Sequence, residues 1–235
     1  MNPARMRGLA AVAAAVTLAL TPVAALAQRA DDKAAKLYED ALVRYEGNDA
    51  AGAVIQLKNA LRLDPRMVAG YLLLGKASLA KGDAAAAEEA FARALELGAS
   101  RTEVAAPMAQ AMLQLGKQEA LLERLSPDGL PPAEKVELLV LRGHAHRSLG
   151  DAKAAARAFE DARAIDPKSI PAIVGYADLL TQQGKGADAA KLTDQAVAIA
   201  PNDPRVWNLK GSLAQATGDS NGALAAYTKA LTGDP

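Results

Sequence analysis

The chain has 235 residues, of which 51% are hydrophobic and 23% charged, so it is long enough to bury a sizeable core in one or two domains. Its 27 basic residues balance 27 acidic ones, and aromatic residues make up only 3%, which argues against a nucleic-acid binder. Cysteine is absent, which excludes disulfides, thiolate metal sites and cysteine nucleophiles. Alanine and leucine, both strong helix formers, are in excess, so we expect an all-α protein.

The first 27 residues have the pattern of a secretory signal peptide. Arg5 and Arg7 precede an apolar run over 9–20, and small residues stand at Ala25 and Ala27. The apolar run is shorter than the roughly 20 residues that cross a bilayer, which argues against a membrane anchor. We therefore predict a signal peptide at 1–27, a short lead-in at 28–33, and an exported product in a Gram-negative periplasm. No further spanning segment follows in the sequence.

The rest of the sequence repeats with a period of 34 residues. Leu-Asp-Pro ends at Pro65 and Ile-Asp-Pro ends at Pro167, three periods later; Pro201 and Pro235 follow at one period each. This register divides the chain into six units, at 34–67, 68–101, 102–135, 136–169, 170–203 and 204–235. A repeat sustained over this length predicts a stacked array.

Each unit has the pattern of a helix, a turn and a second helix. In the fourth unit, Leu139 is followed four residues later by Gly143, Gly150 marks the turn, and Phe159 lies between two alanines on the second helix. The glycine lets two helix backbones approach, and we expect the large side chain to fill the space between units. No unit can bury its apolar face alone, so the units must stack into a solenoid.

These residues resemble the tetratricopeptide repeat (TPR) family over about 34–235. The resemblance implies a right-handed α-solenoid of six helix-turn-helix units that binds other proteins. The stretches 38–42 (YEDAL), 56–61 (QLKNAL) and 73–77 (LLGKA) are similar, more narrowly, to the TPR-repeat protein of PEP-CTERM/exosortase systems, which accompanies exopolysaccharide production and protein sorting at Gram-negative surfaces. Members of that group are longer arrays and often lipoproteins, whereas this chain has six units and no cysteine.

Two irregularities interrupt the pattern. The segment from Ser126 to Pro132 cuts the second helix of the third unit short, and it is either a tolerated degenerate repeat or a joint between two halves of the array. The other irregularity is at the end of the sequence. It stops in phase with the repeat, and no polar helix follows to cover Leu224, Tyr227 and Leu231. We expect either a fragment of a longer array, or a face that meets a partner or a second copy.

Apparent catalytic and metal motifs have simpler explanations. Residues 70–76 read G-x-x-x-x-G-K, but Ala77 replaces the serine or threonine of a phosphate-binding loop and the segment lies within a predicted helix. His144 and His146 are two residues apart on a predicted helix and point in different directions. With no nucleophile–base pair at a meaningful spacing, we predict a non-enzymatic protein without cofactor or metal.

The TPR resemblance implies that the first helix of each unit lines a concave groove. The partner-binding candidates at the corresponding positions are Leu72, Lys76, Leu79, Gln110, Gln114, His144, Arg147, Asp178, Asn208 and Gln215, with Tyr38, Leu42, Tyr45, Val140, Val174, Thr181, Arg205 and Ser212 beside them. This groove runs from apolar to polar along the chain, so we expect an extended peptide or a helix to dock there. For Tyr38 and Leu42, packing against the neighbouring helix is an equal alternative. No unit has the lysine–asparagine pair of the carboxylate clamp that binds chaperone C-termini.

The sequence therefore predicts an exported TPR scaffold that binds proteins during cell-envelope assembly, in exopolysaccharide export or PEP-CTERM protein sorting. One alternative is a periplasmic adaptor for pilus or outer-membrane assembly. Another is a solenoid that binds polysaccharide directly, for which Tyr38 and Tyr45 are the stacking candidates. Nucleic acid is not an expected partner.

Overall fold

The computed structural model describes residues 21–232, with side chains from Asp32 onward. Most of the predicted signal peptide, residues 1–20, lies outside the described residues, as do 233–235. The described residues form helices and no strand, which confirms the all-α prediction. The helices are α1 (Thr21–Glu46), α2 (Ala50–Leu63), α3 (Val68–Lys81), α4 (Ala84–Glu96), α5 (Arg101–Gln114), α6 (Gln118–Arg124), α7 (Pro132–Ser148), α8 (Ala152–Ile165), α9 (Ile170–Gln182), α10 (Gly186–Ile199), α11 (Pro204–Ala216) and α12 (Ser220–Thr232).

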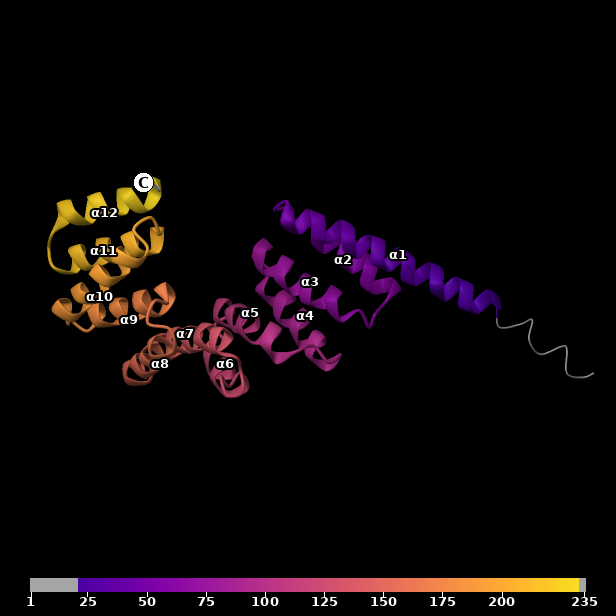
Figure 1. Ribbon diagram of the computed structural model, residues 1–235, viewed down its shortest axis with the longest axis horizontal. Coiled ribbons are helices and arrows are strands. Elements are labelled where there is room, and N and C mark those ends of the chain that lie inside the picture. The colour runs from indigo at the N-terminus through magenta and orange to yellow at the C-terminus, as the bar shows by residue number, and fades with distance from the viewer. Residues whose placement is uncertain (1–20, 233–235) are drawn as a thin grey trace, which may run out of the picture.

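Successive helix pairs stack into an arc, as the solenoid prediction requires. In Figure 1 the arc runs from α1–α4 through α5–α8 to α9–α12, and both ends rise on the same side of the middle. Each odd-numbered helix packs closely against the next odd-numbered helix, whereas the described even-numbered helices meet one another only through long side chains, such as Arg124 of α6 and Glu88 of α4 at 3.4 Å. The odd-numbered helices therefore form the continuous inner wall, and the even-numbered helices are splayed along the outside.

The predicted caps and turns define the helix ends. The carboxylates of Asp83 and Asp151 accept hydrogen bonds from the backbone N–H groups of Ala86 and Ala154, at 3.1 and 2.9 Å, as N-caps of α4 and α8. Gly150 ends the turn after α7 with φ of 79°, a left-handed conformation that glycine adopts without a Cβ penalty. In these units the pattern of glycine followed by aspartate therefore separates the two helices, whereas Lys117 and Lys185 follow the glycine in the third and fifth units without a side-chain cap.

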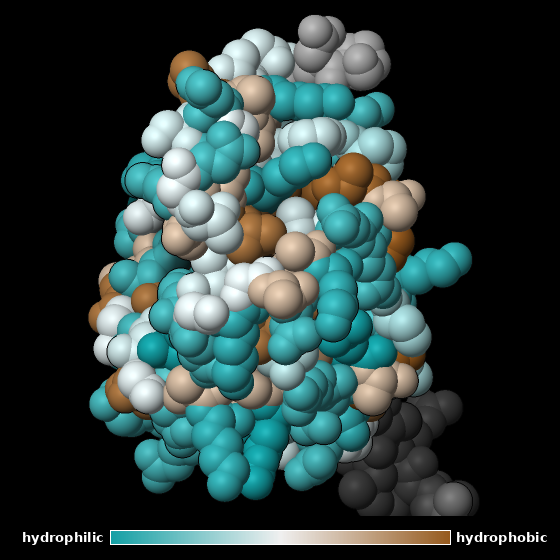
Figure 2. Space-filling view, turned by 90° about the vertical axis from the view of Figure 1, so that its left-hand side faces the viewer, coloured by the Kyte–Doolittle hydropathy of each residue, from teal (hydrophilic) through white to brown (hydrophobic). Residues whose placement is uncertain are grey.

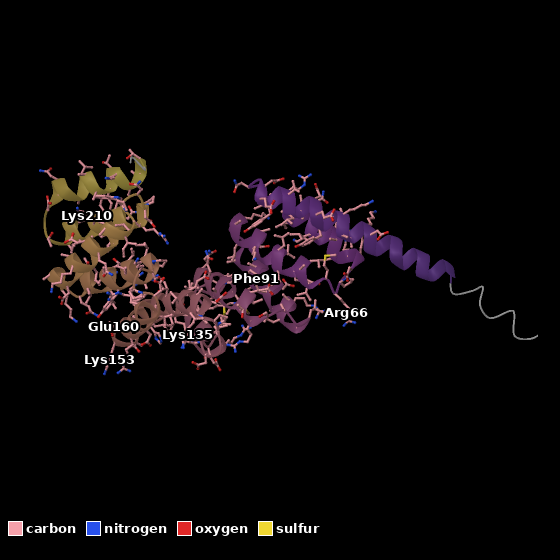
Figure 3. All side chains as sticks on the ribbon, viewed as in Figure 1. Arg66, Phe91, Lys135, Lys153, Glu160 and Lys210 are labelled. Carbon is pink, nitrogen blue, oxygen red and sulfur yellow. The ribbon has the colours of Figure 1, made fainter. Side chains whose placement is uncertain are left out.

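Glycines on the inner helices face the large aromatic rings of the outer ones. A Cβ built on Gly143 of α7 would lie 2.6 Å from the Phe159 ring, and one on Gly175 of α9 would lie 2.5 Å from the same ring. Phe159 is fully buried between them, and Phe91 is fully buried beside Gly75 in the same way. Figure 3 shows Phe91 within the N-terminal half of the arc. The aromatic ring thus joins one unit to the next, as the sequence predicts.

The shortened third unit is tied to its neighbours. Helix α6 spans only seven residues, and the Arg142 guanidinium of α7 donates hydrogen bonds to the carbonyl oxygens of Leu122 and Leu125, at 2.9 and 2.8 Å. Arg101 of α5 donates to the Ser126 carbonyl at 2.8 Å. Leu125 is buried in a core cluster that continues into α7. These contacts favour a tolerated degenerate repeat over a joint at 126–132.

Helix α12 exposes apolar residues at positions that are buried between units earlier in the array. Leu224 and Leu231 are 68% and 88% exposed. Five periods earlier, Val54 and Leu61 are 7% and 8% exposed, because they pack in a cluster with Leu73 of α3. The exposed pair on α12 therefore occupies positions that the next unit covers within the array.

Candidate partner-binding groove

Two hollows open side by side on the inner wall of the C-terminal half. The larger has a volume of about 480 Å³ and the smaller about 260 Å³. Both are lined by His144, Val174, Gly175 and Arg205, so they form one continuous surface, which we call the C-terminal groove. The larger hollow adds Gln110, Ala133, Val136, Glu137, Val140, Leu141, Ser169 and Pro171, and the smaller adds Asp178, Asn208, Leu209 and Ser212.

The C-terminal groove brings together many of the residues that the TPR resemblance implies. Gln110, His144, Asp178 and Asn208 line it, although they come from four different inner helices. Val140, Val174, Arg205 and Ser212 line it as well. Arg147 lies next to it, paired with Asp178 across α7 and α9.

The remaining candidates lie elsewhere. Lys76, Gln114 and Gln215 are exposed but line neither hollow. Leu72 and Leu79 are half-buried against the core cluster around Phe91, and Thr181 bonds back to the carbonyl of its own helix at Ala177. Tyr38, Leu42 and Tyr45 are half-buried against the cluster of Ala41, Leu57 and Leu73, so the packing alternative describes them. The N-terminal half uses its apolar inner residues to hold helices together.

Several residues that line the groove are not predicted by the sequence pattern. Val136 and Leu209 are almost fully buried beneath the groove, and Pro171 and Ser169 lie at the start of α9. These residues do not stand at the inner-wall positions that the TPR resemblance implies. They reach the groove only through the gap between neighbouring inner helices. Gly175 carried a usable signal, since the corresponding positions of the neighbouring units, Leu141 and Leu209, hold leucine and the glycine leaves space there.

Two charged side chains that line the C-terminal groove, Asp178 and Arg205, are each held in an ion pair. Arg147 donates to the Asp178 carboxylate, which also accepts a hydrogen bond from Gln182 at 3.1 Å. Arg205 makes several contacts with the Asp203 carboxylate, the shortest of 2.6 Å. These hydrogen bonds lower the pKa of Asp203 and raise that of Arg205. Apart from Glu137 at its rim, the groove therefore presents ion pairs rather than free charges among the described residues.

His144 is held as an uncharged ring in the C-terminal groove. Its imidazole packs edge-on against Phe159, with the ring centroids 5.3 Å apart. Burial, with a smaller effect of the nearby Arg147 cation, lowers the pKa of His144 to about 4, although Asp178 acts in the opposite direction. At neutral pH this side chain adds a polar but neutral group to the wall of the groove.

We expect the stability of the protein to fall as the pH is lowered from about 6.5 towards 4.5. In this range the unfolded chain binds a proton at His144 that the folded state does not, so the free energy of unfolding decreases as pH falls. After allowance for partial exposure of the ring, we expect His144 to account for about 1–2 kcal/mol. The measurement is urea unfolding at several pH values. His146, whose pKa is also lowered by burial, contributes in the same direction.

The control for this effect is His144→Gln, which keeps a polar side chain without the titration. The variant should lose part of the pH dependence between 6.5 and 4.5, while Asp49 and Asp203, whose pKa values are lowered, affect stability only at lower pH. An identical pH profile in the variant would contradict the assignment to His144.

The apparent phosphate-binding motif is part of a helix. Residues 70–76 lie inside α3, so their backbone N–H groups are used by the helix and do not form a phosphate loop. Within the described part of the chain, no group of three metal-binding side chains comes together. The described helices also include none that is long and apolar enough to cross a membrane. Figure 2 views the molecule from the side of α9–α12, where the surface is mostly hydrophilic and hydrophobic residues form small separate patches.

Comparison with known proteins identifies the class. Tetratricopeptide repeat models match residues 38–102, 146–213 and 204–235. Together these matches span more than half of the chain, which therefore belongs to the tetratricopeptide repeat family. Proteins of this fold generally serve as scaffolds that bind other proteins.

Particular relatives share parts of their sequence or fold with this chain. Anaphase-promoting complex subunit 7 of Arabidopsis thaliana is 28% identical over 167 residues, which is 70% of this chain and 30% of the relative. Cellulose synthase operon protein C of Xanthomonas axonopodis pv. citri is 29% identical over 204 residues, which is 78% of this chain and 13% of the relative. The chain thus spans less than a third of either curated relative.

Solved structures confirm the fold. Pseudomonas aeruginosa PilF superimposes with a TM-score of 0.65 at 18% identity, over 84% of this chain and 90% of that chain. PilW, a widely conserved type IV pilus biogenesis factor, gives a TM-score of 0.64 at 16% identity, over 85% and 92%. At these identities the likeness concerns the fold alone.

Proposed function

We propose that this protein is an exported adaptor that holds a protein partner in the C-terminal groove during assembly of the cell envelope. The observation that carries the proposal is the groove itself. Two adjoining hollows cross the inner helices of four successive units, with Val140, Val174 and Leu209 at the floor and polar side chains at the rim. An apolar floor with a few placed polar groups is typical of a binding surface.

Exopolysaccharide export is the setting that we propose for this adaptor. The 29% identical relative belongs by its name to a cellulose synthase operon, which supports this setting. PEP-CTERM protein sorting rests on the resemblance of 38–42, 56–61 and 73–77 alone. Export itself rests on the predicted signal peptide, and the mature protein should then begin at Gln28.

A pilus or outer-membrane adaptor is the second candidate. PilF and PilW have the same fold over most of their length, which is compatible with that setting but does not select it. Direct polysaccharide binding is less favoured, because Tyr38 and Tyr45 are half-buried against the first core cluster and offer no open stacking surface.

We expect the double variant His144→Ala, Arg147→Ala to lose most partner capture. His144 lines both hollows and Arg147 lies next to them, so their removal changes the wall of the groove and leaves Asp178 without its cation. The measurement is cross-linked purification of the tagged protein from envelope extract of the producing cell, with the captured proteins identified by mass spectrometry.

The matched control is Lys153→Ala, Arg157→Ala on the outer helix α8, where both side chains are exposed. This variant should capture the same partner as the unmodified protein. Melting curves of both variants establish whether they are folded. Undiminished capture by a folded groove variant would place the contact outside the C-terminal groove, and recovery of glycan without protein would favour the polysaccharide alternative.

A further inference from the structure

The charge balance of the C-terminal groove limits the chemistry of its occupant. The cations of Arg147 and Arg205 are neutralised by Asp178 and Asp203, and His144 is uncharged at neutral pH. Except for a cation beside Glu137 at the rim, a charged partner group would have to break one of these pairs or lie in the groove without a counter-ion. Both routes cost free energy, because a partly buried charge needs an opposite charge or water.

Glu137 is the exception among the described charges that line the groove. Its carboxylate lies at the rim of the larger hollow, is exposed, and has no cation within ion-pair distance among the described side chains. An exposed rim charge contributes little to affinity but repels a like charge. An acidic partner is therefore the least suitable occupant.

The floor of the groove favours apolar side chains. Val136, Val140 and Leu209 are 8%, 6% and 3% exposed, and their remaining surface faces the hollows that they line. Apolar groups that enter the two hollows would remove this surface from water together with their own. Because the hollows adjoin through Val174 and Gly175, one continuous segment can reach both.

Two carboxamides are available at the rim for a peptide backbone. Gln110 lines the larger hollow and Asn208 the smaller one, and both side chains are exposed. A carboxamide offers an N–H donor and a carbonyl acceptor, which match the acceptor and donor of an extended peptide. Neither amide forms a side-chain hydrogen bond within the described residues 32–232.

From these observations we infer that the C-terminal groove takes an extended protein segment that is uncharged within the groove and anchors apolar side chains in the two hollows. This inference rests on the proposed function, because it names the chemistry of the partner held at the same surface. A groove that recognises the carboxylate of a chain terminus would need an unpaired cation, and none lines either hollow among the described residues.

The test is selection of peptides from a random-sequence library displayed on phage, with the purified protein as the target. The selected peptides should be enriched in apolar residues and depleted in both acidic and basic ones relative to the starting library. In the variants Asn208→Asp and Gln110→Glu, a carboxylate replaces an amide of the same shape beside each hollow. Each should weaken binding of the selected peptides by about tenfold, because the new carboxylate must lose water as the peptide binds.

The matched control is Asn221→Asp, the same amide-to-carboxylate change on the outer helix α12 at an exposed position that lines neither hollow. It should bind the selected peptides as the unmodified protein does. Enrichment of acidic or basic peptides, equal binding by all three variants, or no enrichment at all would each overturn the inference. If any of these results accompanies loss of partner capture by the His144→Ala, Arg147→Ala variant, the inference fails while the proposed function stands.

Discussion

Replacement of Phe159 by alanine should lower the free energy of unfolding by about 3–5 kcal/mol. The ring is 0% exposed and lies between Gly143 of α7 and Gly175 of α9. Because the two helix backbones on either side are held by their own hydrogen bonds, they cannot collapse fully into the space that the ring leaves. The cost is therefore the lost burial of the ring together with that of a residual cavity.

Urea unfolding followed by circular dichroism measures this effect. The control is Val43→Ala, a large-to-small change at a side chain that is 68% exposed, which should alter stability by no more than about 0.5 kcal/mol. A loss of less than about 1 kcal/mol in Phe159→Ala would show that the ring does not join the fourth and fifth units.

Adding a single methyl group at Gly175 should also destabilise the protein, by about 2–3 kcal/mol. Alanine favours a helix over glycine by up to about 1 kcal/mol, so propensity alone predicts the opposite sign. The new Cβ would lie 2.5 Å from Phe159 Cε1, and the ring cannot retreat because Gly143 approaches it equally closely from α7. Steric overlap is therefore expected to exceed the gain in helix propensity.

Two further variants, again measured by urea unfolding, test whether steric overlap with Phe159 causes the destabilisation. Gly186→Ala in α10 should not destabilise, because the nearest atom to its Cβ is Thr217 Cγ2 at 3.8 Å. Combining Gly175→Ala with Phe159→Leu should cost less than the sum of the two single changes, since the smaller side chain makes room for the methyl group. Strict additivity would mean that Gly175 and Phe159 do not interact.

The period of 34 residues made most of the fold predictable. Local signals carry it: Asp83 and Asp151 cap their helices, Gly150 ends one, and the spacing of Gly143 and Phe159 anticipates their contact. All of these depend on residues within one unit, where sequence separation and spatial proximity coincide. The predicted shortening of the second helix in the third unit is likewise confirmed by α6.

The groove was predictable only in part, because it depends on how neighbouring units sit against one another. Tyr38 and Leu42 have the pattern of groove residues but are half-buried in the packing of the first pairs. The pairing of Arg147 with Asp178 joins two units across 31 positions in sequence, and periodicity contains no information about it. The neutralisation of Asp178 and Arg205 in the C-terminal groove follows from such pairings and emerges only from the structure.

Photo-cross-linking from single positions tests the central claim most directly. A photoreactive amino acid is placed at Asn208 in the C-terminal groove, or at Lys153 on the outer helix α8, and the protein is irradiated in the cell that produces it. Figure 3 shows Lys153 at the outer edge of the arc. We predict that Asn208 forms a cross-link to one protein partner and that Lys153 does not. A partner cross-linked from Lys153 and not from Asn208 would contradict the assignment of function to the C-terminal groove.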